Sequence, residues 1–360
     1  MNLYLDNIVF SLQRAGGISV VWYELLKRIL KDSDFNPLFI EARNENIFRN
    51  KLNISQKQII LGNNGKYPML LQRYLNPSRI ETKGIFHSSY YRIAKGTHIT
   101  NVTTVHDFTY EYYRKGLARK IHSIQKSNAI RKSRRIICVS ENTKKDLLKF
   151  FPDINEKDVR VVYNGVDDIY TPVLEKQEDQ IKQIVPFSSF EYVLFVGGRD
   201  HYKNFEIAVK ACKKANIPLV IVGGGPITKT ERAFLAENYF VHLSGIDNEQ
   251  LNILYNHALC LLYPSLYEGF GIPILEAQRA GCPVISTNYS SIPEVAGKGA
   301  ILLNEVTVSH IVEMLNMIKK DFSFSKNLRQ EGFKNSVRFS WAKCYQETKS
   351  LYKELYEEYF

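Results

Sequence analysis

The chain has 360 residues, of which 44% are hydrophobic and 24% charged, and its formal net charge is +11. This length is long for one hydrophobic core and predicts two domains, and the composition is that of a globular, soluble protein. No run approaches the ~18 apolar residues of a membrane span. The N-terminal residues carry an acid and turn polar early, so we do not expect a signal peptide.

The first part of the chain alternates strand-like apolar runs with helical stretches. The expected strands are 2–10, 36–42, 84–89, 101–107, 135–140 and 159–165, and the expected helices are 18–31, 114–133 and 142–150. Strand–helix alternation with β-branched residues in the strands predicts a parallel sheet with right-handed crossovers.

A second series of the same kind follows. Its expected strands are 191–197, 218–223, 239–245, 258–264 and 283–287, and its expected helices are 204–215, 228–238, 248–257 and 273–280. The polar, acidic stretch 168–188 lacks a strand and is the expected linker. We therefore expect an α/β protein with two doubly wound, Rossmann-like domains, 1–170 and 188–340, that face a cleft.

Residues 341–360 have the apolar periodicity of a helix. Apolar positions recur at i, i+3 or i+4 and i+7 from Trp341 to Tyr359, which predicts an amphipathic helix. Such a helix needs an apolar groove, and we expect it to cross back to the N-terminal domain. The five cysteines are scattered, with no C-x-x-C pair, which predicts buried, reduced thiols in the cytoplasm.

The stretch SLYEGFGIPILEAQRAGCP, residues 265–283, concentrates the chemistry-bearing residues. Gly269 and Gly271 permit tight turns and a close approach of ligand to backbone. Pro273 suits the first position of a helix, and Gly281 suits its exit. Residues 270–274 are therefore expected to run into a helix N-terminus, whose N–H groups suit a diphosphate.

Two carboxylates lie on either side of this turn. Glu268 precedes it and Glu276 lies one turn into the helix. Carboxylates accept hydrogen bonds from paired hydroxyls, such as those of a ribose or another sugar. The arrangement favours a nucleotide-sugar, with one acid for each sugar and the amides for the diphosphate. The alternative, that each acid merely caps a helix, explains Glu276 alone but not the whole set.

These residues resemble a known family. E-G-F-G-I-P-I-L-E-A-Q-R-A-G-C-P-V-I-S-T is similar to the E-x7-E region of family-4 retaining glycosyltransferases, which have the GT-B fold. Further matching pieces run along nearly the whole chain in the same order, from Gly16-Gly17 near the start to F-S-W at 339–341. The nearest branch is the mannosyltransferase-like enzymes of bacterial surface polysaccharides, which make O-antigen, lipopolysaccharide or capsule.

The resemblance implies a role for each matching residue. Glu276 would bind the ribose hydroxyls of the donor and Glu268 those of the transferred sugar. Lys203, opening a helix with Asn204, would pair with the diphosphate, and Gly17 would let a first-domain loop approach the β-phosphate. Amides would hold the sugar and diphosphate along Phe270, Gly271, Ile272, Pro273 and Ile274.

Two further positions, Arg199 and His106, have two interpretations each. Arg199 lies four residues before Lys203, one fewer than is usual in the family, and either reaches the diphosphate or is a plain surface residue. His106, at the end of a strand, is either structural or orients the donor sugar, and we expect the second. Asp107 and Tyr110 are acceptor candidates.

Basic residues dominate one part of the first domain. Residues 51–150 contain 20 Lys and Arg against 5 Asp and Glu, which predicts a polyanionic partner. The basic stretch 114–135 carries cations together with Leu117, Ile121, Ile124 and Ile130 on a helix, which fits a membrane surface or a lipid diphosphate. An ordinary helix with a solvated basic face is the alternative. No nucleic-acid-binding motif is visible, so we expect no nucleic acid partner.

The expected reaction is the transfer of a hexose, with mannose as a candidate, from a GDP- or UDP-sugar to a hydroxyl. The acceptor would be a glycan or a polyprenyl-diphosphate-linked glycan, at the cytoplasmic face of the inner membrane. Retention is implied by the resemblance. Asp32 and Asp34 form the one Asp-x-Asp, in a polar turn, and we expect no metal or other cofactor. A sugar phosphorylase, a nucleotide-sugar epimerase and a non-catalytic nucleotide-sugar binder remain alternatives.

Overall fold

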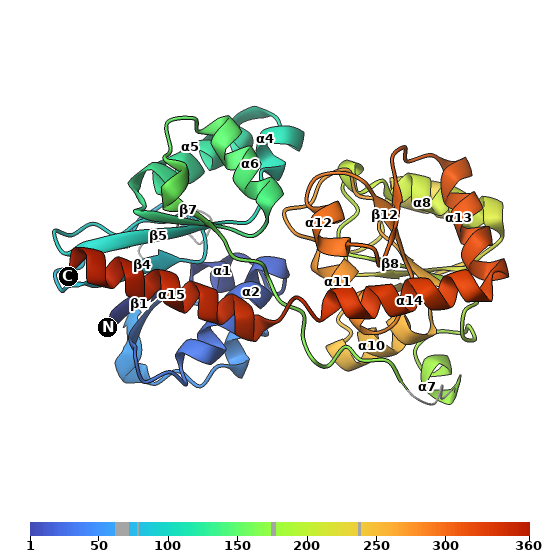
Figure 1. The fold of residues 1–360 in the computed structure, drawn as a ribbon, viewed down its shortest axis with the longest axis horizontal. Coiled ribbons are helices and arrows are strands. Elements are labelled where there is room, and N and C mark those ends of the chain that lie inside the picture. The colour runs from blue at the N-terminus through green and yellow to red at the C-terminus, as the bar shows by residue number, and fades with distance from the viewer. Residues whose placement is uncertain (62–71, 78, 174–177, 237–238) are drawn as a thin grey trace. The chain divides into compact units, whose positions relative to one another are not determined.

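The computed structural model describes residues 1–61, 72–77, 79–173, 178–236 and 239–360 (Figure 1). The chain forms two compact units. Unit 1 contains Met1–Asn164 together with Trp341–Phe360, and unit 2 contains Gly165–Ser340. The expected linker 168–188 already belongs to unit 2, apart from residues 174–177, which lie outside the described residues. Backbone N–H groups of Thr171 and Val173 bond to the side chains of Asn252 and Asn256, which holds the start of this stretch on unit 2.

Unit 1 is built on a parallel sheet of order β3-β2-β1-β4-β5-β6-β7. The strands are β1 (Asn2–Asp6), β2 (Asn36–Glu41), β3 (Ile59–Leu61), β4 (Gly84–Ser88), β5 (Ile99–Val105), β6 (Arg135–Cys138) and β7 (Val159–Val161). The strand order reverses between β1 and β4, and it is at such a switch that open α/β sheets bind ligands.

The helices of unit 1 connect these strands. They are α1 (Ile8–Leu12), α2 (Gly17–Ile29), α4 (Thr109–Tyr113), α5 (Gly116–Lys132), α6 (Glu141–Phe150) and α15 (Trp341–Tyr359), with short 3₁₀ turns η1 (Arg49–Lys51), η2 (Gln56–Gln58) and η4 (Glu156–Asp158). The expected strand 2–10 is wrong in its second half, because β1 ends at Asp6 and the apolar residues Ile8, Val9 and Phe10 are buried from helix α1.

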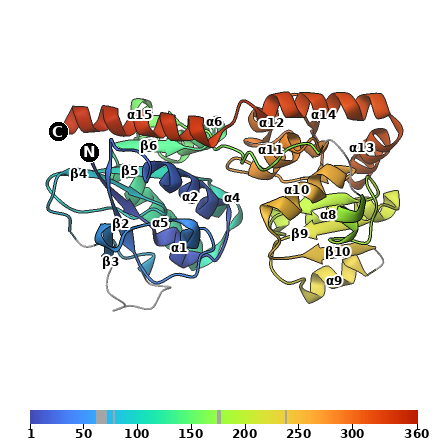
Figure 2. The ribbon, with the colours of Figure 1, turned by 90° about the horizontal axis from the view of Figure 1, so that it is seen from below.

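The C-terminal helix α15 packs beside α2 in the core of unit 1 (Figure 2). Leu351, Tyr352 and Leu355 are fully buried in the cluster that also holds strands β1, β2 and β4. Asp32 and Asp34 anchor this helix: Lys349 Nζ lies 2.5 Å from Asp32 Oδ2 and 2.7 Å from Asp34 Oδ2. The Asp-x-Asp is thus an ion-pair anchor for the chain's last helix.

Unit 2 contains a second parallel sheet, of order β10-β9-β8-β11-β12-β13. Its strands are β8 (Val193–Val196), β9 (Leu219–Val222), β10 (Phe240–Leu243), β11 (Cys260–Leu262), β12 (Val284–Thr287) and β13 (Ile301–Leu303). Every residue of β8, β9, β11 and β12 is buried, as expected for strands covered on both faces. The strand order reverses between β8 and β11.

The helices of unit 2 are α7 (Glu178–Lys182), α8 (Phe205–Ala215), α9 (Lys229–Leu235), α10 (Asn248–His257), α11 (Ile272–Arg279), α12 (Ile292–Ala296), α13 (Val308–Lys320) and α14 (Phe322–Ser336), with the 3₁₀ turn η5 (His201–Lys203). Residues 237–238 of the expected helix 228–238 lie outside the described residues. Sequence analysis missed two strands of three residues, β3 and β13, and three helices of five residues, α4, α7 and α12. It also missed the longer helices α13 and α14. No described helix is long and apolar enough to cross a membrane.

Candidate functional site

The turn between β11 and α11 in unit 2 has the geometry expected of residues 268–276. Gly271 caps α11 with φ of 102°, a left-handed conformation that favours glycine. Pro273 occupies the first turn of the helix. The expected row of amides is shorter than predicted, however, because proline has no N–H and the Ile274 N–H already donates to the Gly271 carbonyl at 3.0 Å.

Two serines hold this turn in place. The Glu268 N–H donates to Ser290 Oγ at 2.8 Å. Ser291 Oγ donates to the carbonyls of Glu268 and Phe270, at 2.9 and 3.0 Å. The Phe270 ring is buried against Phe339, so any ligand contact of Phe270 would run through its main chain.

Lys203 and Glu268 meet beside this turn. Lys203 ends η5, which follows β8, and its ammonium forms an ion pair with Glu268 Oε1. The Lys203 Nζ also lies 3.4 Å from the Tyr263 hydroxyl. The two side chains are only 13% and 11% exposed. Asn204, in a left-handed conformation, donates from Nδ2 to the Pro264 carbonyl at 2.9 Å and ties the two turns together.

The position of this pair follows from the sheet. Strands β8 and β11 are neighbours and flank the point where the strand order of unit 2 reverses. The turns that carry Lys203 and Glu268 both leave the carboxyl ends of these strands. The carboxyl edge at a switch point is where doubly wound sheets bind nucleotides and other ligands.

Glu276 lies one turn into α11 and is held by two phenols. The Tyr255 hydroxyl donates to Glu276 Oε2 at 3.0 Å, and Tyr170 also hydrogen-bonds the carboxylate. Burial raises the pKa of Glu276 to about 7, although both tyrosines favour the charged form and oppose this rise. Once the Glu276 carboxyl is ionised, it can accept hydrogen bonds from a diol.

Arg199 has structural partners in this conformation. Its Nε lies 2.7 Å from Glu231 Oε1, and its other nitrogens donate to the carbonyls of Gly223, Gly225 and Pro226 at 2.7–3.0 Å. The Arg199 side chain is only 3% exposed. These contacts hold the 223–226 loop, and the buried side chain does not match a plain surface arginine. Contact of Arg199 with a diphosphate stays a prediction.

Unit 1 presents its own group of candidate residues. His106 follows β5 and lines a cavity of about 30 Å³ with Trp22, His87 and Asn164. Burial lowers the pKa of His106 to about 4, so the imidazole is neutral at pH 7. Gly17 opens α2, and a Cβ added there would meet open space.

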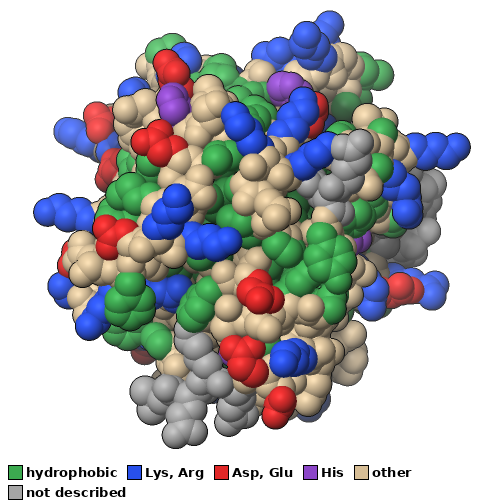
Figure 3. All heavy atoms as spheres, turned by 90° about the vertical axis from the view of Figure 1, so that its right-hand side faces the viewer, with side chains coloured by type: hydrophobic (Ala, Val, Ile, Leu, Met, Phe, Trp, Pro, Cys, Tyr) green, Lys and Arg blue, Asp and Glu red, His purple; other side chains and the backbone are tan. Residues whose placement is uncertain are grey.

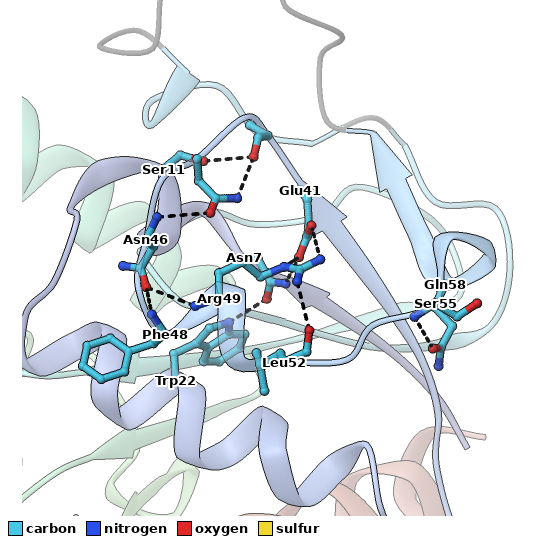
Figure 4. Close-up of polar contacts among 12 residues, drawn as sticks. Asn7, Ser11, Trp22, Glu41, Asn46, Phe48, Arg49, Leu52, Ser55 and Gln58 are labelled. Carbon is cyan, nitrogen blue, oxygen red and sulfur yellow. Dashed lines mark hydrogen bonds and ion pairs between the residues drawn. The ribbon is translucent and has the colours of Figure 1, made fainter.

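A polar network supports the start of α2 (Figure 4). Asn7 donates to Glu41 at 2.6 Å and accepts from the Trp22 indole at 2.7 Å, while Arg49 bonds both oxygens of Glu41. Asn46 donates to the Gln13 carbonyl at 2.7 Å. These bonds fix the segment that leads into Gly17.

The acceptor candidates have structural partners in unit 1. Asp107 Oδ1 accepts the Thr109 N–H at 2.9 Å. The Tyr110 ring stacks on His122, with ring centroids 3.7 Å apart. Among the described residues, no group of three or more His, Cys, Asp or Glu is placed to hold a metal ion.

Comparison with known proteins agrees with this geometry. Residues 176–335 match the family described as "Glycosyl transferases group 1", and residues 15–169 match "Glycosyltransferase Family 4". The chain thus carries a Glycosyltransferase Family 4 domain followed by a group 1 glycosyl transferase domain. It is 26% identical over 271 residues to the O-antigen chain mannosyltransferase B of Escherichia coli, covering 71% of this chain and 70% of that protein. An uncharacterized glycosyltransferase of Methanocaldococcus jannaschii is 25% identical over 359 residues, 94% of this chain and 95% of that one.

Solved structures place this glycosyltransferase in the GT-B fold. Sucrose-phosphate synthase from Thermosynechococcus elongatus superposes with a TM-score of 0.78 at 15% identity, covering 99% of this chain and 100% of that one. Anabaena HepE in complex with UDP-glucose gives 0.76 at 14% identity, covering 98% and 99%. The expected fold of two Rossmann-like domains is confirmed.

Sequence analysis missed the residues that support the site of this glycosyltransferase. Tyr170 and Tyr255, which hydrogen-bond Glu276, lie 106 and 21 positions away from it, and neither has a motif of its own. Ser290 and Ser291 lie in the stretch S-S-I-P-E-V-A-G, residues 290–297, and nothing in its spacing pointed to Glu268. Lys203 lies beside Glu268 in this structure, and the catalytic and binding roles of all these residues stay predictions.

Proposed function

We propose that this glycosyltransferase transfers a hexose, with mannose as the leading candidate, from a GDP- or UDP-sugar to a hydroxyl of a glycan or lipid-linked glycan. The observation that carries the proposal is the Lys203–Glu268 ion pair beside the α11 N-terminus, one turn from Glu276. At this edge of the sheet lie one cation, two carboxylates and the N-terminus of a helix. The names of the similar O-antigen mannosyltransferases support mannose and surface polysaccharide synthesis.

Each group has a role in the proposed reaction. The anomeric C–O bond to the diphosphate breaks, and a new C–O bond forms to the acceptor oxygen with retention of configuration. The acceptor proton goes to the departing diphosphate oxygen. Lys203 stabilises the charge that develops on this oxygen, as a preorganised cation does best in a partly dry site. Glu268 and Glu276 bind sugar and ribose hydroxyls, and His106 orients the transferred sugar.

The experiment has two stages. A panel of GDP- and UDP-sugars is first screened for thermal stabilisation, because a ligand at 100 times its dissociation constant adds ~2.7 kcal/mol. The stabilising donor is then incubated with and without hydroxyl acceptors, and the anomeric configuration of the product is read by NMR. We expect sugar transfer only with an acceptor, and an α-linked product from an α-linked donor.

Matched lysine variants test the site itself. Lys203→Gln should lower turnover about 100-fold, the usual effect of removing one charge-stabilising group. Lys210→Gln on α8, which removes a similar but exposed pair with Glu206, should leave turnover unchanged. Conversion of the donor without acceptor would instead indicate an epimerase, and stabilisation without any turnover would indicate a binding protein.

A further inference from the structure

The N-terminal half of α5 in unit 1 is exposed on all sides. Every residue from 112 to 121 is exposed, including Leu117 at 72%, and further along the helix Ile124 is 69% exposed. The side of α5 that packs on the unit includes His122 and Lys126, both buried. The buried side of α5 also holds the apolar residues Ala129 and Ile130, so it is the N-terminal half of the helix that presents large aliphatic side chains to solvent.

The exposed aliphatic residues form one stripe. Leu117, Ile121 and Ile124 recur at i, i+4 and i+7 and so share a face of α5. Next to this stripe, Ile124 and the rings of Phe150 and Phe151 line a groove of about 910 Å³ between α5 and α6. The apolar surface is thus continuous from the helix to the groove.

Cations border the stripe without acidic partners. Lys120 lies three residues after Leu117 and four before Ile124, and Lys115 and Arg119 also line the groove. Among the described residues, none of these three cations forms an ion pair. The sequence has no Asp or Glu between 112 and 140. By contrast, the face of the molecule drawn in Figure 3 carries Lys and Arg side chains that are interspersed with Asp and Glu.

We propose that α5 docks unit 1 on an anionic lipid bilayer. Leu117, Ile121 and Ile124 enter the boundary between head groups and acyl chains, and Lys115, Arg119 and Lys120 contact the lipid phosphates. An anionic bilayer provides acyl chains for the aliphatic side chains and phosphates for the unpaired cations. A symmetric dimer would bring the same cations against one another. Nucleic acid would leave the aliphatic stripe without a partner. The proposal does not depend on the proposed reaction.

The test is vesicle sedimentation of the full chain. Vesicles of phosphatidylcholine with about a third phosphatidylglycerol are compared with pure phosphatidylcholine, at about 0.05 and 0.5 M salt. We expect strong binding to the anionic vesicles at low salt, weak binding at high salt, and little binding to the neutral ones. Replacing Lys115, Arg119 and Lys120 with Gln should weaken binding about fivefold for each cation removed.

A second variant separates insertion from charge. Leu117→Ser with Ile124→Ser should weaken binding about tenfold or more for each residue, at unchanged net charge. The control is the unit 2 variant Lys319→Gln/Lys320→Gln/Phe322→Ser, which removes exposed cations and an 81% exposed ring and should bind as the parent does. Equal binding by the α5 and control variants, or no binding to anionic vesicles at low salt, would overturn the proposal. So would a parent dimer in sedimentation velocity that only the α5 variants dissociate, since it would assign α5 to a second copy.

Discussion

Glu276 offers a prediction in which stability and binding move in opposite directions. Its carboxyl is partly buried under Tyr170 and Tyr255, and its pKa is about 7 in the ligand-free protein, against 4.5 for an ordinary glutamate. Glu276→Gln keeps the shape and a carbonyl acceptor for the tyrosines but never ionises. We expect the variant to be more stable than the parent at pH 8 and to bind the nucleotide-sugar more weakly.

The sign and size follow from proton linkage. Between pH 4.5 and 7 the folded protein holds a proton on Glu276 that the unfolded chain has lost, so the free energy of unfolding falls as the pH rises. A rise of about 2.5 pKa units at ~1.36 kcal/mol each gives an upper bound of about 3 kcal/mol above pH 7. For a unit of this size, that corresponds to a rise in Tm of roughly 6–12 °C for the variant.

The assay measures Tm and nucleotide-sugar affinity of both proteins between pH 4.5 and 8. The Tm difference should be small at pH 4.5 and grow until about pH 7. Glu313→Gln, which neutralises an exposed carboxyl of α13, is the control and should change neither quantity. An equal or lower Tm for Glu276→Gln at pH 8, or a difference that does not vary with pH, would refute the reasoning.

The remaining predictions concern metal, packing and the imidazole. Transfer activity should survive EDTA, and Asp32→Asn/Asp34→Asn should lower Tm without creating a metal requirement; activity that returns only with Mg²⁺ or Mn²⁺ would contradict this. Leu355→Ala should destabilise unit 1 by about 2–5 kcal/mol, measured by urea unfolding, because a fully buried side chain leaves a cavity. With a pKa near 4, His106 should leave no step near pH 6.5 in the kcat profile, and His106→Ala should lower kcat with a small change in Tm.

Much of the fold could be predicted because it depends on local patterns. Short apolar runs separated by helical periods gave most strands of both sheets, and the i, i+4 recurrence from Trp341 gave helix α15. The prediction that the first strand extends through Phe10 was wrong, because an apolar run of this length is compatible with either a strand or a helix. Asn7 decides the outcome, since its side chain bonds to Glu41 and Trp22, residues that are distant in sequence.

The candidate site, too, could be predicted from the sequence only in part. Glu268, Gly271, Pro273 and Glu276 lie within nine residues, so their spacing alone could indicate a turn, a helix start and two acids. The same spacing overstated the number of free amides, because the Ile274 N–H is used inside the turn. Backbone hydrogen bonds of this kind depend on the conformation of the turn, which a residue pattern does not specify.

By itself, the sequence determined the periodicity of the elements, the order of the two sheets' strands along the chain and the residues available for chemistry. Only the tertiary structure decided which of these residues contact one another. Lys203 reaches Glu268 across 65 positions because β8 and β11 are adjacent. Arg199 is held instead by Glu231 and the 223–226 loop. Contacts between distant residues depend on strand pairing, which local propensity does not encode.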